Sequence, residues 1–377
     1  MNETPIFIAA GVGEGATTVD GKHKPYLRID NRSNIQIVLE EVVKTKNSRP
    51  IYIWGSEPDL NEELNSIITR ERDKREINII SQRGNIVENA IFAYFFYLKN
   101  SDKDFKEIYS RLNEWQDVVH EWKNIRAYFK EKDIASHQAD ILLSDIPLVT
   151  SEEIDFLLMN KNPDADLFVG WSLKESFDEV MKKVDPCIDY SKIKMNFFPL
   201  MKKGRHRNKL LYCRFNGFLS ARHLDISLGI LDFVPYLYKY RDLIRGERSN
   251  FKKIRKIMRE LVKRTDKENL DSGMNKVRAL YYLFALGISG LISHYLHFKK
   301  FNKWLPYLQY PFLDINRMQK NIKKLSGNDI RFHITNTIGL LFDTDGDAYH
   351  FVKENYNELR NSIDEYYSKN GMQLIHS

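Results

Sequence analysis

The sequence predicts an α/β protein whose core is a mostly parallel β-sheet with helices on both faces, in a Rossmann-like three-layer sandwich. In the first half, short apolar runs alternate with longer segments whose apolar residues recur at helical spacing. Near the C-terminus, an apolar run at 337–343 and a helical pattern at 347–368 repeat the order of strand and then helix. Between these parts the pattern is helical almost throughout 224–325, which predicts a helical insertion.

Five strands are expected in the first half, because each run is short, apolar and rich in β-branched or aromatic residues. They are IFIAA at 6–10, IYIW at 51–54, INII at 77–80, DILL at 140–143 and LFVGW at 167–171. The helices expected after them span 34–46, 59–72, 86–99, 151–160 and 173–183. The fourth helix has a clear start signal, Ser151 followed by Glu152 and Glu153.

The domain layout follows from these elements. A chain of 377 residues is long enough for one large domain with insertions. We expect residues 1–220 and 326–377 to form the core and 221–325 to form a helical insertion subdomain. A smaller helical insertion is expected at 101–137, where two tryptophans stand among many charged residues.

The composition is typical of a folded protein in a reducing compartment. Apolar residues make up 42% and aromatic residues 12% of the chain, which excludes a disordered protein. The two cysteines, Cys187 and Cys213, form neither a metal-binding spacing nor a disulfide framework. The N-terminus has no signal-peptide pattern. We therefore expect a cytoplasmic protein.

The formal net charge of +7 favours an anionic ligand without requiring one, and we expect no nucleic-acid partner. Basic residues gather at 201–209 and at 245–264. The first cluster is a candidate for phosphate contact, although a solvated loop also explains it, and the second favours a solvated helix face. The apolar run at 280–296 favours a buried helix, with a helix lying on a membrane surface as the alternative.

A glycine-rich loop follows the first expected strand. Ala10 ends the strand, Gly11, Gly13 and Gly15 come next, and Lys24 stands before a proline. Glycines let a backbone approach phosphate closely, and a lysine can place a point charge on the same group. Mobile turn glycines are an equally good explanation of the loop taken alone.

Acidic residues follow two expected strands. Asp145 comes just after the run at 140–143, and DTDGD places Asp343, Asp345 and Asp347 around the end of the run at 337–343. If these strands are neighbours, like charges at their tips would be costly without a cation between them, and Mg²⁺ accepts one or two protein carboxylates. Turn or helix-capping aspartates remain the alternative.

Three stretches and their order resemble the MobA-like nucleotidyltransferases, which have the nucleotide-diphospho-sugar transferase fold. The opening, IAAGVGEG followed by GKHKPYLRIDNRSNIQIVLEEV, looks like the glycine-rich loop, lysine and first helix of that family. DILLSDIPLVTSEEIDFLL is similar to its metal-aspartate motif, and LLFDTDGDAYHFVKEN to its closing strand. GNIVENAIFAYFFYL, ADLFVGWSLKESFDEV and KLLYCRFNGFLSAR resemble segments between them. The likeness covers most of 5–220 and 326–370, but the opening loop lacks the arginine that many relatives carry.

The resemblance implies an enzyme that transfers a nucleoside monophosphate from a nucleoside triphosphate to a phosphorylated or hydroxyl acceptor, releases pyrophosphate and depends on Mg²⁺ or Mn²⁺. It implies that Asp145 and Asp345 hold the metal ion, with Asp343 as the substitute, and that Lys24 acts on the α-phosphate. The implied nucleotide-binding residues are Ala10, Gly11, Gly13, Gly15, Lys24, Asn89 and Ser144. The implied contacts to a small anionic acceptor are Arg205, Arg207 and Asn216.

Two other functions remain open at this point. A glycosyltransferase of the related fold would use a nucleotide sugar, although such enzymes usually show Asp-x-Asp after a central strand, which SDIPL lacks. A non-catalytic nucleotide-binding protein at a membrane surface would use 245–264 and the apolar run at 280–296. Four histidines form no ligand set with the carboxylates and are expected to be ordinary core or surface residues: His120, His294, His297 and His333.

Overall fold

The computed structural model describes residues 5–11, 18–47, 49–132, 138–162, 164–184, 198–202, 209–222, 314–326, 329–344 and 346–376. The strands of its main sheet are β1 (Ile6–Ala10), β6 (Ile51–Gly55), β7 (Ile77–Ser81), β8 (Ala139–Leu143), β9 (Leu167–Leu173), β10 (Phe198–Lys202), β11 (Lys209–Ala221), β12 (Ile330–Thr335) and β13 (Leu374–His376). Two small hairpins pair β2 (Thr18–Val19) with β3 (Lys22–His23) and β4 (Arg28–Ile29) with β5 (Arg32–Ser33).

The helices around the sheet are α1 (Asn34–Lys44), α2 (Glu57–Glu71), α3 (Ile86–Ser101), α4 (Lys103–Tyr109), α5 (Trp115–Glu131), α6 (Ser151–Asn160), α7 (Lys174–Val184), α12 (Ile315–Ser326), α13 (Asp347–Glu354) and α14 (Tyr356–Asn370). Two 3-10 turns are also present in the described residues. Lys24 is the first residue of η1 (Lys24–Tyr26), and η5 (Gly339–Leu341) precedes Asp343. The five strands and five helices expected in the first half are all present. The segment 101–137 contains α4 and α5, with a non-helical connection at 110–114, and 133–137 lies outside the described residues.

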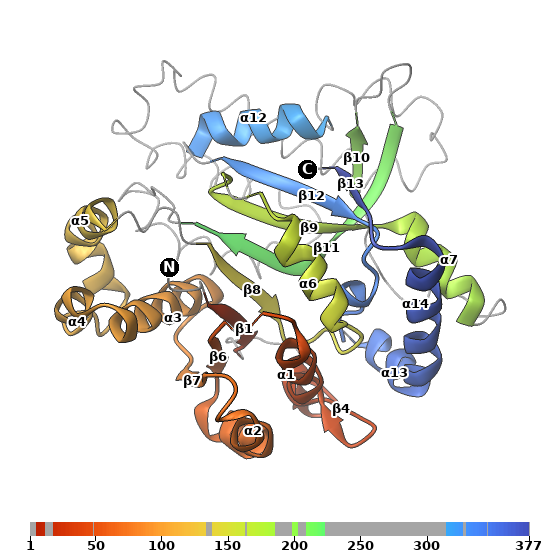
Figure 1. The fold of residues 1–377 in the computed structure, drawn as a ribbon, viewed down its shortest axis with the longest axis horizontal. Coiled ribbons are helices and arrows are strands. Elements are labelled where there is room, and N and C mark those ends of the chain that lie inside the picture. Colours follow the sequence, from red (N-terminus) through yellow and green to blue (C-terminus); the bar gives the residue numbers. More distant parts are fainter. Residues whose placement is uncertain are drawn as a thin grey trace.

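The strands of the main sheet follow the order β13–β12–β9–β11–β8–β1–β6–β7, with β10 paired to β11 (Figure 1). Parallel pairing joins β7 to β6, β6 to β1, β1 to β8 and β9 to β12. Because β11 is antiparallel to both β8 and β9, those two strands run in the same direction. The sheet is therefore mostly parallel, with β11 and β13 reversed among the described strands, and the predicted α/β fold class is confirmed.

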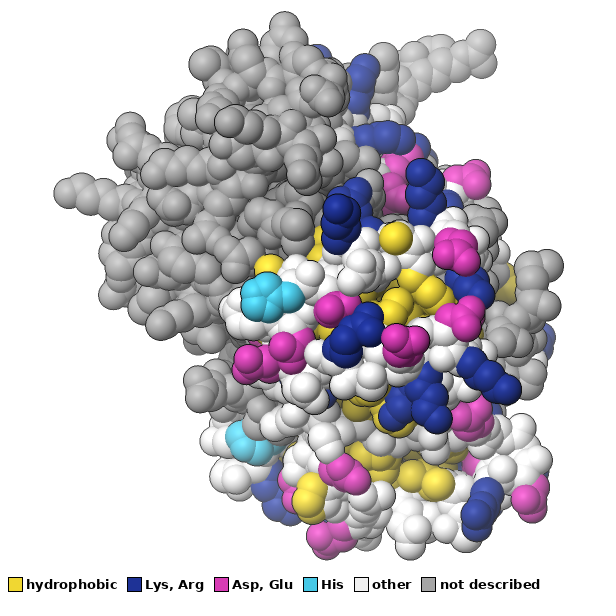
Figure 2. Space-filling model, turned by 90° about the vertical axis from the view of Figure 1, so that its left-hand side faces the viewer, with side chains coloured by type: hydrophobic (Ala, Val, Ile, Leu, Met, Phe, Trp, Pro, Cys, Tyr) yellow, Lys and Arg dark blue, Asp and Glu magenta, His cyan; other side chains and the backbone are white. Residues whose placement is uncertain are grey.

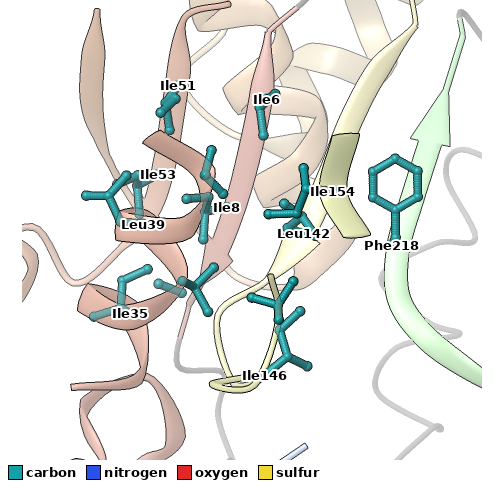
Figure 3. Close-up of a cluster of buried hydrophobic side chains, with 14 of the residues drawn as sticks. Ile6, Ile8, Ile35, Leu39, Ile51, Ile53, Leu142, Ile146, Ile154 and Phe218 are labelled. Atoms are coloured by element: carbon teal, nitrogen blue, oxygen red, sulfur yellow. The ribbon is translucent and has the colours of Figure 1, made fainter. Parts of the chain in front are cut away.

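Alternation along β1 separates two cores. Ile6 and Ile8 face one side of the sheet, where they meet apolar residues of α1, α2 and α6 (Figure 3). Phe7 faces the other side and packs with residues of α3, α4 and α5. Helices therefore cover both faces of the sheet, as the alternating sequence pattern predicts. In Figure 3, Leu142 of β8 and Phe218 of β11 continue the first core across the sheet.

The last core strand differs from the expectation. The structure places β12 at Ile330–Thr335, and the run expected as a strand at 337–343 contains η5 instead. Its backbone N–H groups at Ile338 and Gly339 donate to the Glu153 carboxylate at 2.8 Å rather than to a neighbouring strand. The run is apolar because it is buried against α7, α13 and α14, not because it joins the sheet.

The C-terminal helical pattern at 347–368 divides into α13 and α14 at Asn355. Further upstream, α12 falls within the range expected for the helical insertion but packs against the sheet, where Gln319 accepts a hydrogen bond from the Phe332 N–H at 3.1 Å. Most of that range, 223–313, lies outside the described residues, and so do the basic cluster at 245–264 and the apolar run at 280–296. The division into core and insertion stays a prediction.

The described surface turned toward the viewer in Figure 2 carries basic and acidic side chains intermixed, with small apolar areas between them. Three large apolar side chains are exposed in the described parts of the chain: Ile86, Met159 and Leu374. Within those same parts, every helix is too short or too polar to cross a lipid bilayer. His120 is exposed and His333 is buried, while His294 and His297 lie outside the described residues.

Gly339→Ala should destabilise the fold, because a Cβ at this position would lie 2.2 Å from the Leu148 carbonyl oxygen, a backbone atom that cannot move aside easily. We expect a loss of about 1–3 kcal/mol in the free energy of unfolding, the usual cost of overpacking. Urea denaturation measures it. Gly84→Ala is the matched control, since its Cβ would meet the flexible Glu88 carboxylate at 2.9 Å. Equal stability of the two variants would contradict the close approach at Gly339.

Candidate active site

Asp145 lies at the carboxyl edge of the sheet, two residues after β8. Ser144 fixes this strand end, because its N–H and its hydroxyl both donate to the Ala9 carbonyl of β1, at 3.2 and 2.7 Å. The side chain of Asp145 is 17% exposed, so it is accessible from solvent while its backbone is held between the two strands. The sequence predicts an aspartate just after a buried strand, and the structure has Asp145 at that position.

Asp343 reaches the same place from the far end of the chain. After η5, the Thr344 N–H donates to the Asp145 carbonyl oxygen at 3.1 Å, which ties the two acidic segments together through their backbones. The side chain of Asp343 is 24% exposed. Asp345, the expected second metal ligand, lies outside the described residues, so among the described aspartates of DTDGD it is Asp343 that accompanies Asp145.

Lys24 joins both carboxylates. Its ammonium nitrogen lies 3.3 Å from Oδ2 of Asp145 and 3.1 Å from Oδ1 of Asp343. The lysine opens η1, and the buried ring of Pro25 follows it at a position where a missing N–H costs no hydrogen bond. Three residues that the sequence analysis selected from distant motifs therefore meet in one cluster.

Asn34 connects two of the backbone segments that carry the cluster. It is the first residue of α1 and fully buried. Its side-chain nitrogen donates to the Lys24 carbonyl oxygen at 2.8 Å and to Oγ1 of Thr344 at 2.9 Å. One amide group therefore connects the segment that carries the lysine to the segment that carries Asp343. Sequence reasoning missed Asn34, because a helix-start asparagine is usually a local cap.

Arg214 is a further residue that sequence reasoning missed. It projects from β11, and its Nη2 lies 3.1 Å from Oδ2 of Asp343, the carboxylate oxygen that does not face Lys24. The strand is irregular just beyond it, with a register shift between Phe215 and Leu219 and with Gly217 at φ +78°. Because such bulges re-aim side chains, the alternating pattern of β11 gave no signal for Arg214.

The glycine-rich loop is described at its first glycine. Gly11 follows β1, and a Cβ there would lie 3.4–3.5 Å from side-chain atoms of Trp54, Gln82 and Asn89. Asn89 is buried in α3 and accepts a hydrogen bond from the Arg83 N–H. Ala10, Gly11, Asn89 and Ser144 thus lie near one another at the carboxyl ends of β1, β7 and β8, while Gly13 and Gly15 lie outside the described residues.

Asn216, expected as an acceptor contact, faces the protein interior. It is fully buried, and its side-chain nitrogen donates to Ser172 at 3.2 Å and to Thr337 at 3.3 Å. Its side-chain oxygen accepts the Phe218 N–H at 3.3 Å. The described surroundings of Asn216 are therefore those of a structural residue, and its contact with an acceptor stays a prediction. Arg205 and Arg207 lie outside the described residues.

The buried Glu153 carboxylate fixes the backbone of the segment that leads to Asp343. Glu153 closes a capping box with Thr150 at the start of α6. The same carboxylate accepts from the N–H groups of Ile338 and Gly339 and from the Tyr367 hydroxyl. Because Glu153 is fully buried, desolvation raises its pKa above the ordinary value, against the opposing effect of these hydrogen bonds.

The donor set at the cluster suits a divalent cation. Two carboxylates lie within 3.3 Å of one ammonium nitrogen, so they already converge on a single positive charge. Mg²⁺ takes one or two protein carboxylates and completes its shell with water and phosphate oxygens. Among the described residues, no group of three or more His, Cys, Asp or Glu side chains suited to a metal ion occurs.

Comparison with known proteins finds no matching family model and no matching characterised sequence. Solved structures similar to this chain include a hypothetical transferase from Thermus thermophilus, at 14% identity and a TM-score of 0.46, covering 91% of this chain and 97% of that one. They also include an inositol-1-phosphate CTP transferase from T. maritima, at 10% identity and a TM-score of 0.30, covering 59% and 71%. A CMP-2-keto-3-deoxy-manno-octonic acid synthetase in complex with CTP matches at 13% identity and a TM-score of 0.34, covering 62% and 78%. The fold assignment itself rests on the strand order and directions given above.

Asn34→Ala should lower the free energy of unfolding by about 1–3 kcal/mol, because it removes the amide donor to the buried Thr344 hydroxyl and one of the two donors to the Lys24 carbonyl. Chemical denaturation measures the loss. Asn124→Ala is the matched control, since Asn124 is exposed on α5 and donates to Glu121 at 3.0 Å. If Asn34→Ala were as stable as the control variant, the amide would not be holding these segments together.

Glu153 should make stability fall as pH rises. Its folded-state pKa is raised above the ordinary 4.5, so between these two values the folded protein keeps a proton that the unfolded chain has lost. Relative to Glu153→Gln, we expect the wild-type free energy of unfolding to decrease as pH rises above 4.5, through the interval in which only the folded state keeps the proton. Urea titrations across this range measure the difference. Parallel pH curves for the two proteins would show that the folded-state pKa is not raised.

Proposed function

We propose that the protein is a divalent-metal-dependent nucleotidyltransferase, which transfers a nucleoside monophosphate from a nucleoside triphosphate to a phosphorylated or hydroxyl acceptor and releases pyrophosphate. The observation that carries this proposal is the convergence of Lys24, Asp145 and Asp343 beside Gly11, at the carboxyl edge of the sheet. In open α/β sheets this edge is where ligands bind. The resemblance of the same segments to MobA-like nucleotidyltransferases supports the assignment.

The phosphates would lie along the loop that begins at Gly11. Glycine lets the backbone N–H groups of such a loop approach phosphate oxygens, and Lys24 supplies a positive charge within reach of the same region. Asp145 and Asp343 would hold Mg²⁺ or Mn²⁺, with Asp345 as a further candidate ligand. When bound, the ion would neutralise charge on the phosphate oxygens.

The reaction follows from this arrangement of charge. An acceptor oxygen attacks the α-phosphorus in line, its bond to phosphorus forms, and the bond from phosphorus to the bridging oxygen of the leaving pyrophosphate breaks. The protein needs no covalent intermediate, so it contributes mainly by positioning the two substrates and by stabilising negative charge. Asn34 and the Ser144 hydroxyl contribute indirectly, by fixing the segments that carry Lys24 and Asp145.

The acceptor is expected on the other side of β8 from the glycine loop. In the sheet, β8 lies between β1, which leads to Gly11, and β11, which carries Arg214. A small anionic acceptor placed over β11 would meet the Arg214 guanidinium, which is 21% exposed. The predicted contacts from Arg205 and Arg207 lie outside the described residues and stay predictions.

The activity is tested by measuring pyrophosphate release with ATP, CTP, GTP and UTP, each with Mg²⁺ and with a set of phosphorylated and hydroxyl acceptors. Release with at least one pair of substrates supports the proposal. A glycosyltransferase would instead release a nucleoside diphosphate from a nucleotide sugar, so the same assays with nucleotide sugars separate the two enzymes. A non-catalytic nucleotide-binding protein would be stabilised by a triphosphate without forming either product.

Asp145→Asn should reduce kcat by about 10²–10³ or more, because a neutral amide removes negative charge from the proposed metal site while keeping the shape of the side chain. Steady-state kinetics measure kcat, and thermal unfolding checks that the melting temperature is nearly unchanged. Asp178→Asn is the matched control, since Asp178 pairs with Lys174 on the surface of α7. Full activity of Asp145→Asn would remove Asp145 from the catalytic site.

A further inference from the structure

The Lys24 ammonium group lies where a divalent ion held by Asp145 and Asp343 would bind. A divalent ion bound by Asp145 and Asp343 would need Oδ2 of the first and Oδ1 of the second, or oxygens next to them. Those two oxygens are the ones that the Lys24 ammonium contacts, at 3.3 and 3.1 Å. An ammonium group between two carboxylates and a metal ion between the same carboxylates exclude each other. The lysine and the metal ion therefore compete for one place.

The carboxylates are the fixed part of this arrangement. Asp145 follows a strand end that is anchored to β1, and the Thr344 N–H bonds to the Asp145 carbonyl. These contacts are made by backbone atoms and by Ser144, so they do not depend on the lysine side chain. Without a cation the two like charges would stay close together, at a cost in electrostatic energy. The pair therefore requires some positive charge whether or not a metal ion is present.

The ammonium group is the movable part. The Lys24 backbone is held, since its carbonyl accepts from Asn34 at 2.8 Å and from the Leu27 N–H at 3.3 Å. The side chain beyond it is a flexible four-carbon stem that ends in a compact charge, and it is 21% exposed. Rotation of this stem can withdraw the ammonium group without moving Asn34 or either aspartate.

We propose that Lys24 is an exchangeable cation that occupies the divalent-metal site of the free protein and is displaced from Asp145 and Asp343 when the metal ion binds. The displaced ammonium group stays at the same sheet edge, because its backbone is fixed, and is then available to a phosphate of the incoming nucleotide. This second role rests on the proposed function, whereas the exchange itself concerns the metal ion alone. Lys24 thereby lowers the affinity for free metal ions in the absence of substrate.

The test measures binding of Mn²⁺ alone, without nucleotide, by isothermal titration calorimetry and by the electron paramagnetic resonance signal of free Mn²⁺. Lys24→Gln removes the competing charge, so we expect the Kd for Mn²⁺ to fall by about tenfold or more relative to the wild type. Lys24→Arg keeps a cation and should bind Mn²⁺ as weakly as the wild type. Asp145→Asn and Asp343→Asn, each combined with Lys24→Gln, should lose the gain.

Lys174→Gln is the matched control, because it removes the same charge from a lysine that pairs with Asp178 at 2.7 Å. It should leave Mn²⁺ affinity unchanged. The proposal is overturned if Lys24→Gln binds Mn²⁺ no more tightly than the wild type, or if the gain survives in the aspartate double variants. Far-ultraviolet circular dichroism establishes that each variant is folded.

A second measurement uses the wild-type protein and so does not depend on any variant folding. Amine acetylation followed by mass spectrometry reports how accessible each lysine is. Adding Mg²⁺ should raise the acetylation rate of Lys24 and leave that of Lys174 unchanged, and equal rates for Lys24 with and without Mg²⁺ would contradict displacement. Failure of the proposed function is a different result, namely exchange of Lys24 by the metal ion without pyrophosphate release from any triphosphate.

Discussion

The approach of two like-charged carboxylates, from Asp145 and Asp343, is the constraint on which the rest of the site depends. Two such charges repel unless a cation neutralises them, and both are only partly exposed, so water screens the repulsion incompletely. The two carboxylates are brought close because the Thr344 N–H donates to the Asp145 carbonyl, which joins the backbone segments that carry them. Lys24, which contacts both carboxylates, and Arg214, which contacts Asp343, supply positive charge to the pair.

A buried polar framework behind the cluster makes this arrangement rigid. Glu153 in α6 binds the backbone at Ile338 and Gly339, and Asn34 in α1 connects Lys24 to Thr344. Each of these groups is fully buried, so leaving its partners without a hydrogen bond would be costly, and the backbone has little freedom to take another path. The acidic side chains are thus positioned by buried residues at the starts of α1 and α6.

Much of this could be predicted from the sequence, because the first-half strands are continuous apolar runs and the helices have clear start signals. The final strand was placed wrongly at 337–343, since burial in a turn and burial in a sheet produce the same apolar pattern. The true strand at Ile330–Thr335 alternates apolar residues with Arg331 and His333, which made it less visible. Arg214 and Asn34 gave no signal, because their roles depend on a bulge and on contacts between residues distant in sequence.

The two carboxylate oxygens of Asp343 contact two different cations. Oδ1 faces Lys24, which comes from the segment after the glycine loop, and Oδ2 faces Arg214, which comes from β11. Lys24 also contacts Asp145, whereas Arg214 contacts Asp343, so the two cations reach Asp343 from different segments and on different oxygens. Each oxygen of the Asp343 carboxylate therefore has a cationic partner, and the site carries positive charge from two segments that are far apart in the sequence. Asp343 thus links the segment after the glycine-rich loop to β11 through one carboxylate, and loss of this side chain would leave both Lys24 and Arg214 without one of their acidic partners.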